Sequence, residues 1–128
     1  MAYEAAQVKV GQWTASADLS SKQYHFVKIS GNNTVTVCAA ITDVPVGVLQ
    51  NAPASGGAAE VCIFGVTKVV ADGTLAAGNR IGTSADGQAD AITAGTDTTV
   101  TTVGQALNAA SAGETVEIFF NPSGARAA

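Results

Sequence analysis

Charged side chains are scarce in this sequence. Asp, Glu, Lys and Arg make up 12% of the 128 residues, against about 25% in a typical soluble domain. Alanine, glycine, threonine and valine take much of their place. Because a surface with so little charge does little to repel neighbouring molecules, the composition favours a compact module whose surface contacts other protein.

The few positive charges also argue against a nucleic-acid partner. The net charge is −4, and the six Lys and Arg residues are scattered along the chain. A protein that binds DNA or RNA non-specifically normally presents a basic face. We therefore expect no nucleic acid among the partners.

Targeting signals and long apolar runs are missing too. Residues 1–7 lack the positive and apolar regions of a signal peptide, and no run approaches the roughly 18 apolar residues of a membrane helix. We expect a chain made in the cytoplasm, with no membrane partner. In that setting Cys38 and Cys62 are expected to be buried free thiols rather than a disulfide.

Motifs for cofactors, metals and catalysis are also lacking. The sequence has no Gly-x-Gly-x-x-Gly and no Gly-Lys-Ser/Thr pair, and its one histidine and two distant cysteines do not make a zinc site. We expect no metal, no cofactor and no enzyme activity. The alternative is a thiol enzyme in which His25 activates Cys38 or Cys62, although nothing in their spacing favours it.

Short apolar runs, broken by Gly, Asp, Asn and Pro about every ten residues, dominate the pattern. Such spacing predicts eight to ten short strands in an all-β sandwich or barrel. The clearest predicted strands cover 24–30, 34–38, 46–50, 60–70, 100–107 and 115–120.

Three places in this pattern carry finer predictions. Gly65 interrupts the longest run and predicts a bulge or bend. Asp86-Gly87 lies between two short runs and predicts a type I′ hairpin. Residues 105–112 are alanine-rich, as in a helix, but the β-branched run at 100–103 leads into them and favours a strand followed by a turn.

The chain divides into three predicted parts. Residues 1–16 form an N-terminal arm with one short strand, 17–122 a β-rich domain, and 123–128 a loose C-terminal tail. Trp13, the one tryptophan, lies in the arm. It either fills the domain core or anchors the arm on a partner, since tryptophan is enriched at interface hot spots.

Several short segments stand in a characteristic order. They are ADLSSKQYHFVK at 17–28, VGVLQNAP at 46–53, GVTKVVA at 65–71, LAAGNRI at 75–81, ADG at 85–87, VGQAL at 103–107 and AGE at 112–114, before a final apolar strand. In this order and spacing, over about residues 17–120, the chain resembles the small capsid decoration (cement) proteins of tailed bacteriophages.

The resemblance implies a β-tulip-like fold and homotrimers on the outer surface of the phage head. It also implies binding to the major capsid protein after shell expansion, and no enzyme activity. Three linked contacts in a trimer raise avidity by about 10²–10⁴ over one contact. A protein that binds only the expanded shell stabilises it by mass action.

We expect the capsid contacts in the N-terminal arm, which the resemblance does not cover. An extended segment can add a strand to the edge of a neighbour's sheet. The candidate capsid-binding residues are Tyr3, Glu4, Gln7, Val8 and Trp13.

The alternative function is a virion-surface adhesin or glycan-binding β module. The same scaffold of small residues, with polar loops at 51–57 and 93–99, would suit it. Aromatic side chains for stacking on sugars are few, at 5% of the chain, which counts against this alternative.

Overall fold

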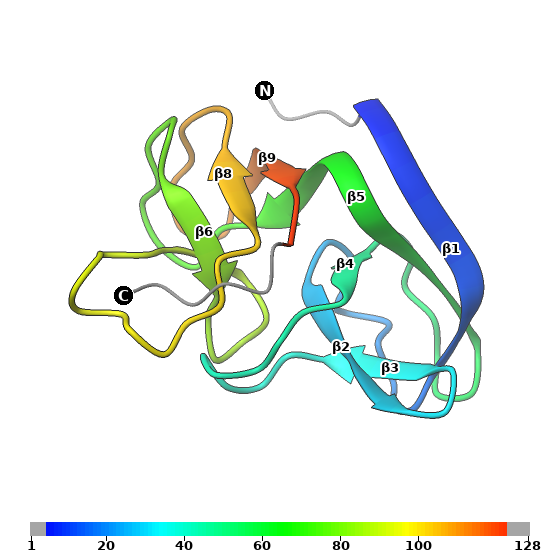
Figure 1. The fold of residues 1–128 in the computed structure, drawn as a ribbon. Coiled ribbons are helices and arrows are strands. Elements are labelled where there is room, and N and C mark those ends of the chain that lie inside the picture. Colours follow the sequence, from blue (N-terminus) through cyan, green and yellow to red (C-terminus); the bar gives the residue numbers. More distant parts are fainter. Residues whose placement is uncertain (1–4, 123–128) are drawn as a thin grey trace.

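The computed structural model describes residues 5–122, without the side chains of residues 5, 6 and 10. Within this range the chain forms nine strands and no helix (Figure 1). The strands are β1 (Ala5–Ala15), β2 (Phe26–Gly31), β3 (Thr34–Val37), β4 (Gly47–Leu49), β5 (Ala58–Val70), β6 (Arg80–Thr83), β7 (Ala89–Ala91), β8 (Gly104–Ala106) and β9 (Thr115–Phe120). The prediction of a small all-β domain, a sandwich or barrel with eight to ten strands, is confirmed, and of the two alternatives the structure shows a barrel with further strands. None of the described segments is a helix long and apolar enough to span a membrane.

The first half of the chain closes into a five-stranded barrel. β1 lies parallel to β3 on one side and antiparallel to β5 on the other, so the order β1-β3-β2-β4-β5 forms a ring. Fully burying one Val or Leu side chain contributes about 1.5–3 kcal/mol, so the filled interior stabilises this half strongly. The interior residues are Ala15, Leu19, Val27, Val35, Leu49, Ala59 and Val61, with Trp13, Val37, Val46 and Ile63 packed against them.

The second half continues the sheet from β5 through β9, β8 and β6 to β7. A parallel bridge between Ala71 and Ala89 then joins β7 to the segment that follows β5, so these strands curl around a second core. Phe26 of β2 reaches into this core and packs on Phe120, with ring centroids 6.2 Å apart. The two halves therefore share a packed boundary.

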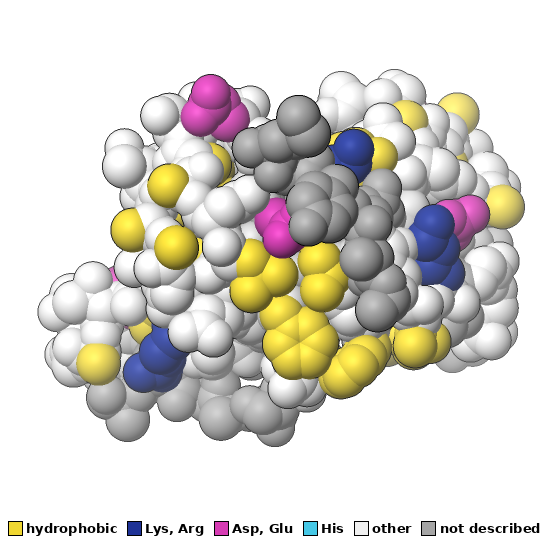
Figure 2. All heavy atoms as spheres, turned by 90° about the horizontal axis from the view of Figure 1, so that it is seen from above, with side chains coloured by type: hydrophobic (Ala, Val, Ile, Leu, Met, Phe, Trp, Pro, Cys, Tyr) yellow, Lys and Arg dark blue, Asp and Glu magenta, His cyan; other side chains and the backbone are white. Residues whose placement is uncertain are grey.

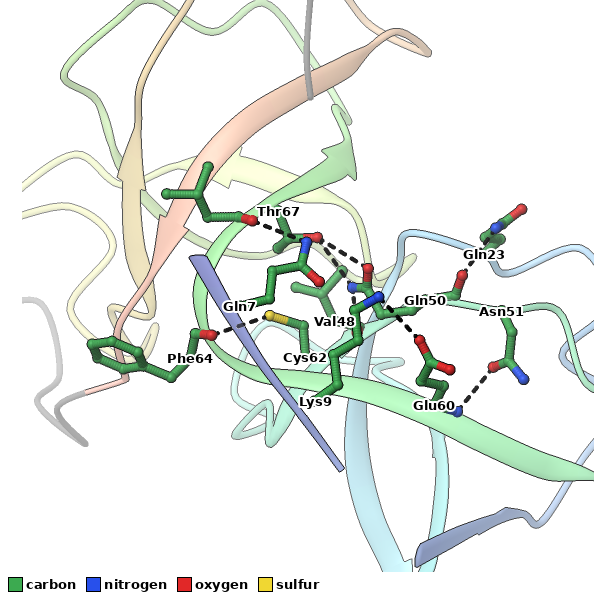
Figure 3. Close-up of polar contacts among 11 residues, drawn as sticks. Gln7, Lys9, Gln23, Val48, Gln50, Asn51, Glu60, Cys62, Phe64 and Thr67 are labelled. Atoms are coloured by element: carbon green, nitrogen blue, oxygen red, sulfur yellow. Dashed lines mark hydrogen bonds and ion pairs between the residues drawn. The ribbon is translucent and has the colours of Figure 1, made fainter. Parts of the chain in front are cut away.

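The longest strand, β5, serves both halves. Its residues Ala59 and Val61 face the first core, and Val69 faces the second. Between them Thr67 is fully buried and accepts a hydrogen bond from Gln50 Nε2 at 3.0 Å (Figure 3). Because buried polar groups are costly without partners, this pair fixes the crossing from one core to the other.

The predicted irregularity at Gly65 is confirmed. Gly65 has φ +118°, and the register of β1 shifts opposite Gly65 and Val66. Figure 1 shows β5 bending strongly along its length. The bend lets one strand line two cores.

Residues 5–15 are a strand of the barrel, which corrects their assignment to an arm outside the domain. β1 pairs with β5 over most of its length, with three register shifts. Lys9 Nζ lies 3.2 Å from Glu60 Oε1, and Gln7 Nε2 donates to the Val66 carbonyl (Figure 3). Each register shift breaks the two-residue alternation, which is why the sequence pattern predicted only one short strand here.

The hairpin of β6 and β7 is confirmed, but its predicted turn type is wrong. A type I′ turn needs positive φ at both central residues, and of Asp86 and Gly87 only Gly87 has it, at +73°. The loop runs from Ser84 to Gln88, and Gly87 O accepts a 2.7 Å bond from Phe26 N. Docking on β2 therefore sets this loop's shape. After β8 the chain turns, as predicted, rather than forming a helix.

Candidate interaction surfaces

The thiols and the histidine singled out in the sequence are buried. Cys38 and Cys62 are free and buried, as predicted. Burial raises the pKa of Cys38 to about 12, and the charge of Asp43 adds to the effect. The Cys38 thiol therefore stays protonated at neutral pH and is a poor nucleophile.

His25 links the two halves of the molecule. Its Nδ1 lies 3.1 Å from the Gln23 carbonyl, and its Nε2 lies 3.4 Å from Gln88 Nε2 on the docked loop. This pattern assigns the proton to Nδ1, so that Nε2 accepts from the Gln88 amide. Burial lowers the pKa of His25, and the charge of Lys22 acts in the same direction.

No metal centre is found in the part of the chain that the structure describes. Among residues 5–122, no three His, Cys, Asp or Glu side chains are grouped where they could hold a metal ion. Two surfaces stand out by their exposed apolar side chains.

The first surface, which we call the proline groove, has a volume of about 520 Å³. It lies where the end of β2, the segment before β4 and the segment after β9 meet. Its lining residues are Lys28, Ile29, Val44, Pro45, Val46 and Pro122. Ile29 is 58% exposed and Val44 62% exposed, so two large aliphatic side chains face solvent here.

An ion pair fixes one wall of the proline groove. Lys28 Nζ lies 2.9 Å from Asp43 Oδ2, which also accepts hydrogen bonds from Ala39 N and Ala40 N. Burial alone would raise the pKa of Asp43, but these hydrogen bonds and the Lys28 charge outweigh it and lower the pKa. Asp43 thereby holds the loop that leads into Val44.

The second surface, which we call the aromatic face, lies on the outside of β1, β5 and β9. Val8 is directly opposite Phe64, and Val66 is directly opposite Phe119, so their side chains share one face. The Phe64 and Phe119 rings meet edge to face at 5.4 Å. Figure 2 shows hydrophobic side chains gathered near the middle of the face seen from above.

A shallow groove, the Arg80 groove, runs from the aromatic face across β8 to β6. Arg80 is opposite Gln105 in the β6–β8 ladder, and Gln105 is opposite Phe119 in the β8–β9 ladder. These three side chains therefore form a row across three strands. The groove has a volume of about 440 Å³, and its lining residues are Arg80, Thr102, Gly104, Gln105, Phe119 and Asn121.

The structure places the predicted capsid-binding residues in different surroundings. Val8 is 49% exposed on the aromatic face, whereas Gln7 is half-buried and bonded to β5. Trp13 packs against the barrel core, which favours the core-filling alternative left open by the sequence. Tyr3 and Glu4 lie outside the described residues.

Most residues of the two surfaces were missed from sequence. Ile29, Val44 and Pro122 are far apart in the chain, and only the closed fold brings them together. Phe64 and Phe119 had one usable signal, since each is an apolar residue on the side of its strand opposite to the core residues. Their contact depends on strand register, which the sequence does not reveal.

The fold is similar to a known one. The chain matches no protein-family model and no curated protein. Among solved structures it is similar to the N base of head fiber gp8.5 in bacteriophage phi29, with a TM-score of 0.70 at 20% sequence identity. The match covers 94% of this chain and 98% of that chain, so the two chains share one fold over nearly their whole lengths.

Proposed function

We propose that this chain is a structural protein of a tailed-phage virion that decorates the outside of the head. The observation that carries the proposal is the likeness to the base of a phage head fiber, which spans 94% of the chain. The order of segments in the sequence supports the same class independently. In this role the protein binds the major capsid protein and stabilises the expanded shell by bridging subunits.

We assign the capsid contact to the proline groove. Its walls are mostly apolar, and Ile29 and Val44 are the two most exposed large hydrophobic side chains among the described residues. Removing such surface from water contributes about 25 cal/mol per Å². Lys28 and Asp43 already pair with each other at its edge, so docking leaves no unpaired charge behind there.

The contact need not be strong at one subunit if the protein is a homotrimer, as we also propose. Three linked contacts multiply the avidity, and a closed threefold ring leaves no free subunit interface at which further chains could associate. Light scattering should then give three times the 12.7 kDa mass of the chain, in solution or after release from heads.

Heads assembled without this protein provide the test. Purified protein should sediment with expanded heads and raise the temperature at which they break open. Val44→Asp should lose binding, whereas Val8→Asp, a similarly exposed residue on the aromatic face, should keep it. If Val8→Asp loses head binding and Val44→Asp keeps it, the capsid contact lies on β1, where the sequence predicted it. No sedimentation of the unmodified protein with any head would refute the function itself.

A further inference from the structure

The Arg80 groove differs from the proline groove because it presents hydrogen-bonding groups and a cation. The described region has two ion pairs, Lys9–Glu60 and Lys28–Asp43, and Arg80 belongs to neither. Arg80 Nη2 donates to Thr102 Oγ1 at 3.3 Å, which orients the guanidinium. Its other N–H donors form the planar fork that binds a carboxylate through two parallel bonds.

The charge around the groove suits an anion. None of its six lining residues is acidic. The next outward-facing residue along β9, Glu117, stands directly opposite Lys68 on β5, so that a cation faces it. A carboxylate beside Arg80 would therefore be attracted by the guanidinium, which is in no ion pair within the described region, and would not be repelled by an acidic residue of the groove lining.

The remaining side chains offer what sugar hydroxyls require. Gln105 Nε2 donates to the Gly78 carbonyl at 3.1 Å, which leaves its Oε1 as an acceptor. Asn121 is exposed and adds both a donor and an acceptor. Phe119, held edge-on by Phe64, provides a fixed aromatic surface for the C–H face of a sugar ring.

The shape suits an extended ligand. Neighbouring strands lie about 4.8 Å apart, so the row from β6 to β9 spans about 10 Å. A Cβ at Gly104 would collide with the Phe119 carbonyl, so β8 and β9 approach each other closely beneath this row. An open groove of this length fits linked sugar units better than an enclosed small molecule.

We propose that the Arg80 groove binds an acidic oligosaccharide. Arg80 pairs with a sugar carboxylate, Gln105 and Asn121 bond to hydroxyl groups, and Phe119 packs against a ring. The Arg80 groove shares no lining residue with the proline groove, although Asn121 of the one and Pro122 of the other are adjacent in the chain. A chain docked on a head through the proline groove in a way that leaves Arg80 uncovered would present the Arg80 groove to the saccharides of a cell surface.

Calorimetry with the full chain tests this with hexagalacturonate as the acidic probe and maltohexaose as the neutral one. Hexagalacturonate should bind, and Arg80→Ala should weaken its binding at least tenfold. Lys22→Ala removes an equal charge from a residue that does not line the groove and should change binding less than twofold. Arg80→Lys should restore only part of the affinity, since a lysine cannot make the paired bonds.

Three outcomes would overturn the proposal. They are no binding of hexagalacturonate, equal binding of both hexasaccharides, and equal losses in Arg80→Ala and Lys22→Ala. Tighter binding of a hexa-aspartate peptide than of hexagalacturonate would reassign the groove to an acidic protein segment. None of these results bears on head binding, so they are separable from failure of the proposed function.

Discussion

The proline groove and the Arg80 groove are similar in volume, about 520 and 440 Å³, but they differ in what lines them. Aliphatic and proline side chains from strand ends and loops make the first. A row of side chains from three paired strands makes the second. An apolar wall gains affinity from area and excludes charge, whereas a row of fixed donors gains selectivity from matching polar groups.

The difference teaches which partner each surface can discriminate. A bare apolar groove accepts any complementary apolar surface, so its specificity comes from shape and from repeated contact in an oligomer. A groove with an oriented guanidinium rejects ligands that leave its donors unpaired. Substitutions should therefore separate two activities on one small domain.

The largest expected effect is at the proline groove. Ile29→Asp combined with Val44→Asp should weaken head binding at least 100-fold, because two carboxylates would be buried without partners. Both side chains are exposed in the free protein, so its melting temperature should change little. Sedimentation with heads measures the loss. If binding survives this double change, the groove is not the capsid contact.

A tenfold effect is expected at Phe119. Phe119→Ala should weaken binding of both hexasaccharides about tenfold, because each packs on the ring, and should leave head binding intact. Phe64→Ala serves as the matched variant, since Phe64 supports Phe119 edge-on but does not line the groove. An edge-to-face pair contributes about 0.5–1.5 kcal/mol, so its effect should be smaller. Calorimetry with equal losses at both positions would contradict the assignment of the ring.

A smaller effect is expected from Asp43→Asn. Removing the charge weakens three hydrogen bonds at the wall of the proline groove and should cost about 1 kcal/mol of stability. The pKa of Asp43 is lowered in the folded state, so its contribution is present above about pH 4 and is lost on further acidification. Urea titrations should show that Asp43→Asn loses less stability on acidification than the unmodified protein does. The same variant should bind heads more weakly and saccharides equally well.

The smallest expected effect is the pH dependence of stability that arises from His25, which links the two halves of the molecule. The pKa of His25 is lowered by burial, so at mildly acidic pH the unfolded chain binds a proton at His25 more readily than the folded chain does. Stability should therefore fall as the pH drops below about 6.5, through the window down to the lowered pKa. In His25→Gln the midpoint of urea unfolding should change less between pH 7 and pH 5 than it does in the unmodified protein. If the urea midpoint of the unmodified protein rises between pH 7 and pH 5, the predicted direction of the pH dependence is wrong.

Much of the fold was readable from sequence because alternation and turn residues are local signals. Residues 34–37 and 115–120 emerged as strands almost at the predicted bounds. β1 was missed as a long strand because its register shifts spoil the alternation. The turn at Asp86-Gly87 was misassigned because docking on Phe26 decides its shape.

The surfaces were much less predictable. Val8 is exposed, and its predicted capsid contact stays a prediction, whereas Trp13 packs on the core. Arg80 and Phe119 stand 39 positions apart and become neighbours only through two specific strand registers. Sequence patterns report which side chains face outward, but not which outward-facing side chains meet.

Electron microscopy of expanded heads saturated with this protein tests the account most directly. We predict added density on the outer surface, fitted by the chain with Ile29 and Val44 against the capsid protein and with the Arg80 groove left open to solvent. Added density in which the proline groove is open to solvent would contradict the account, as would heads that gain no density at all.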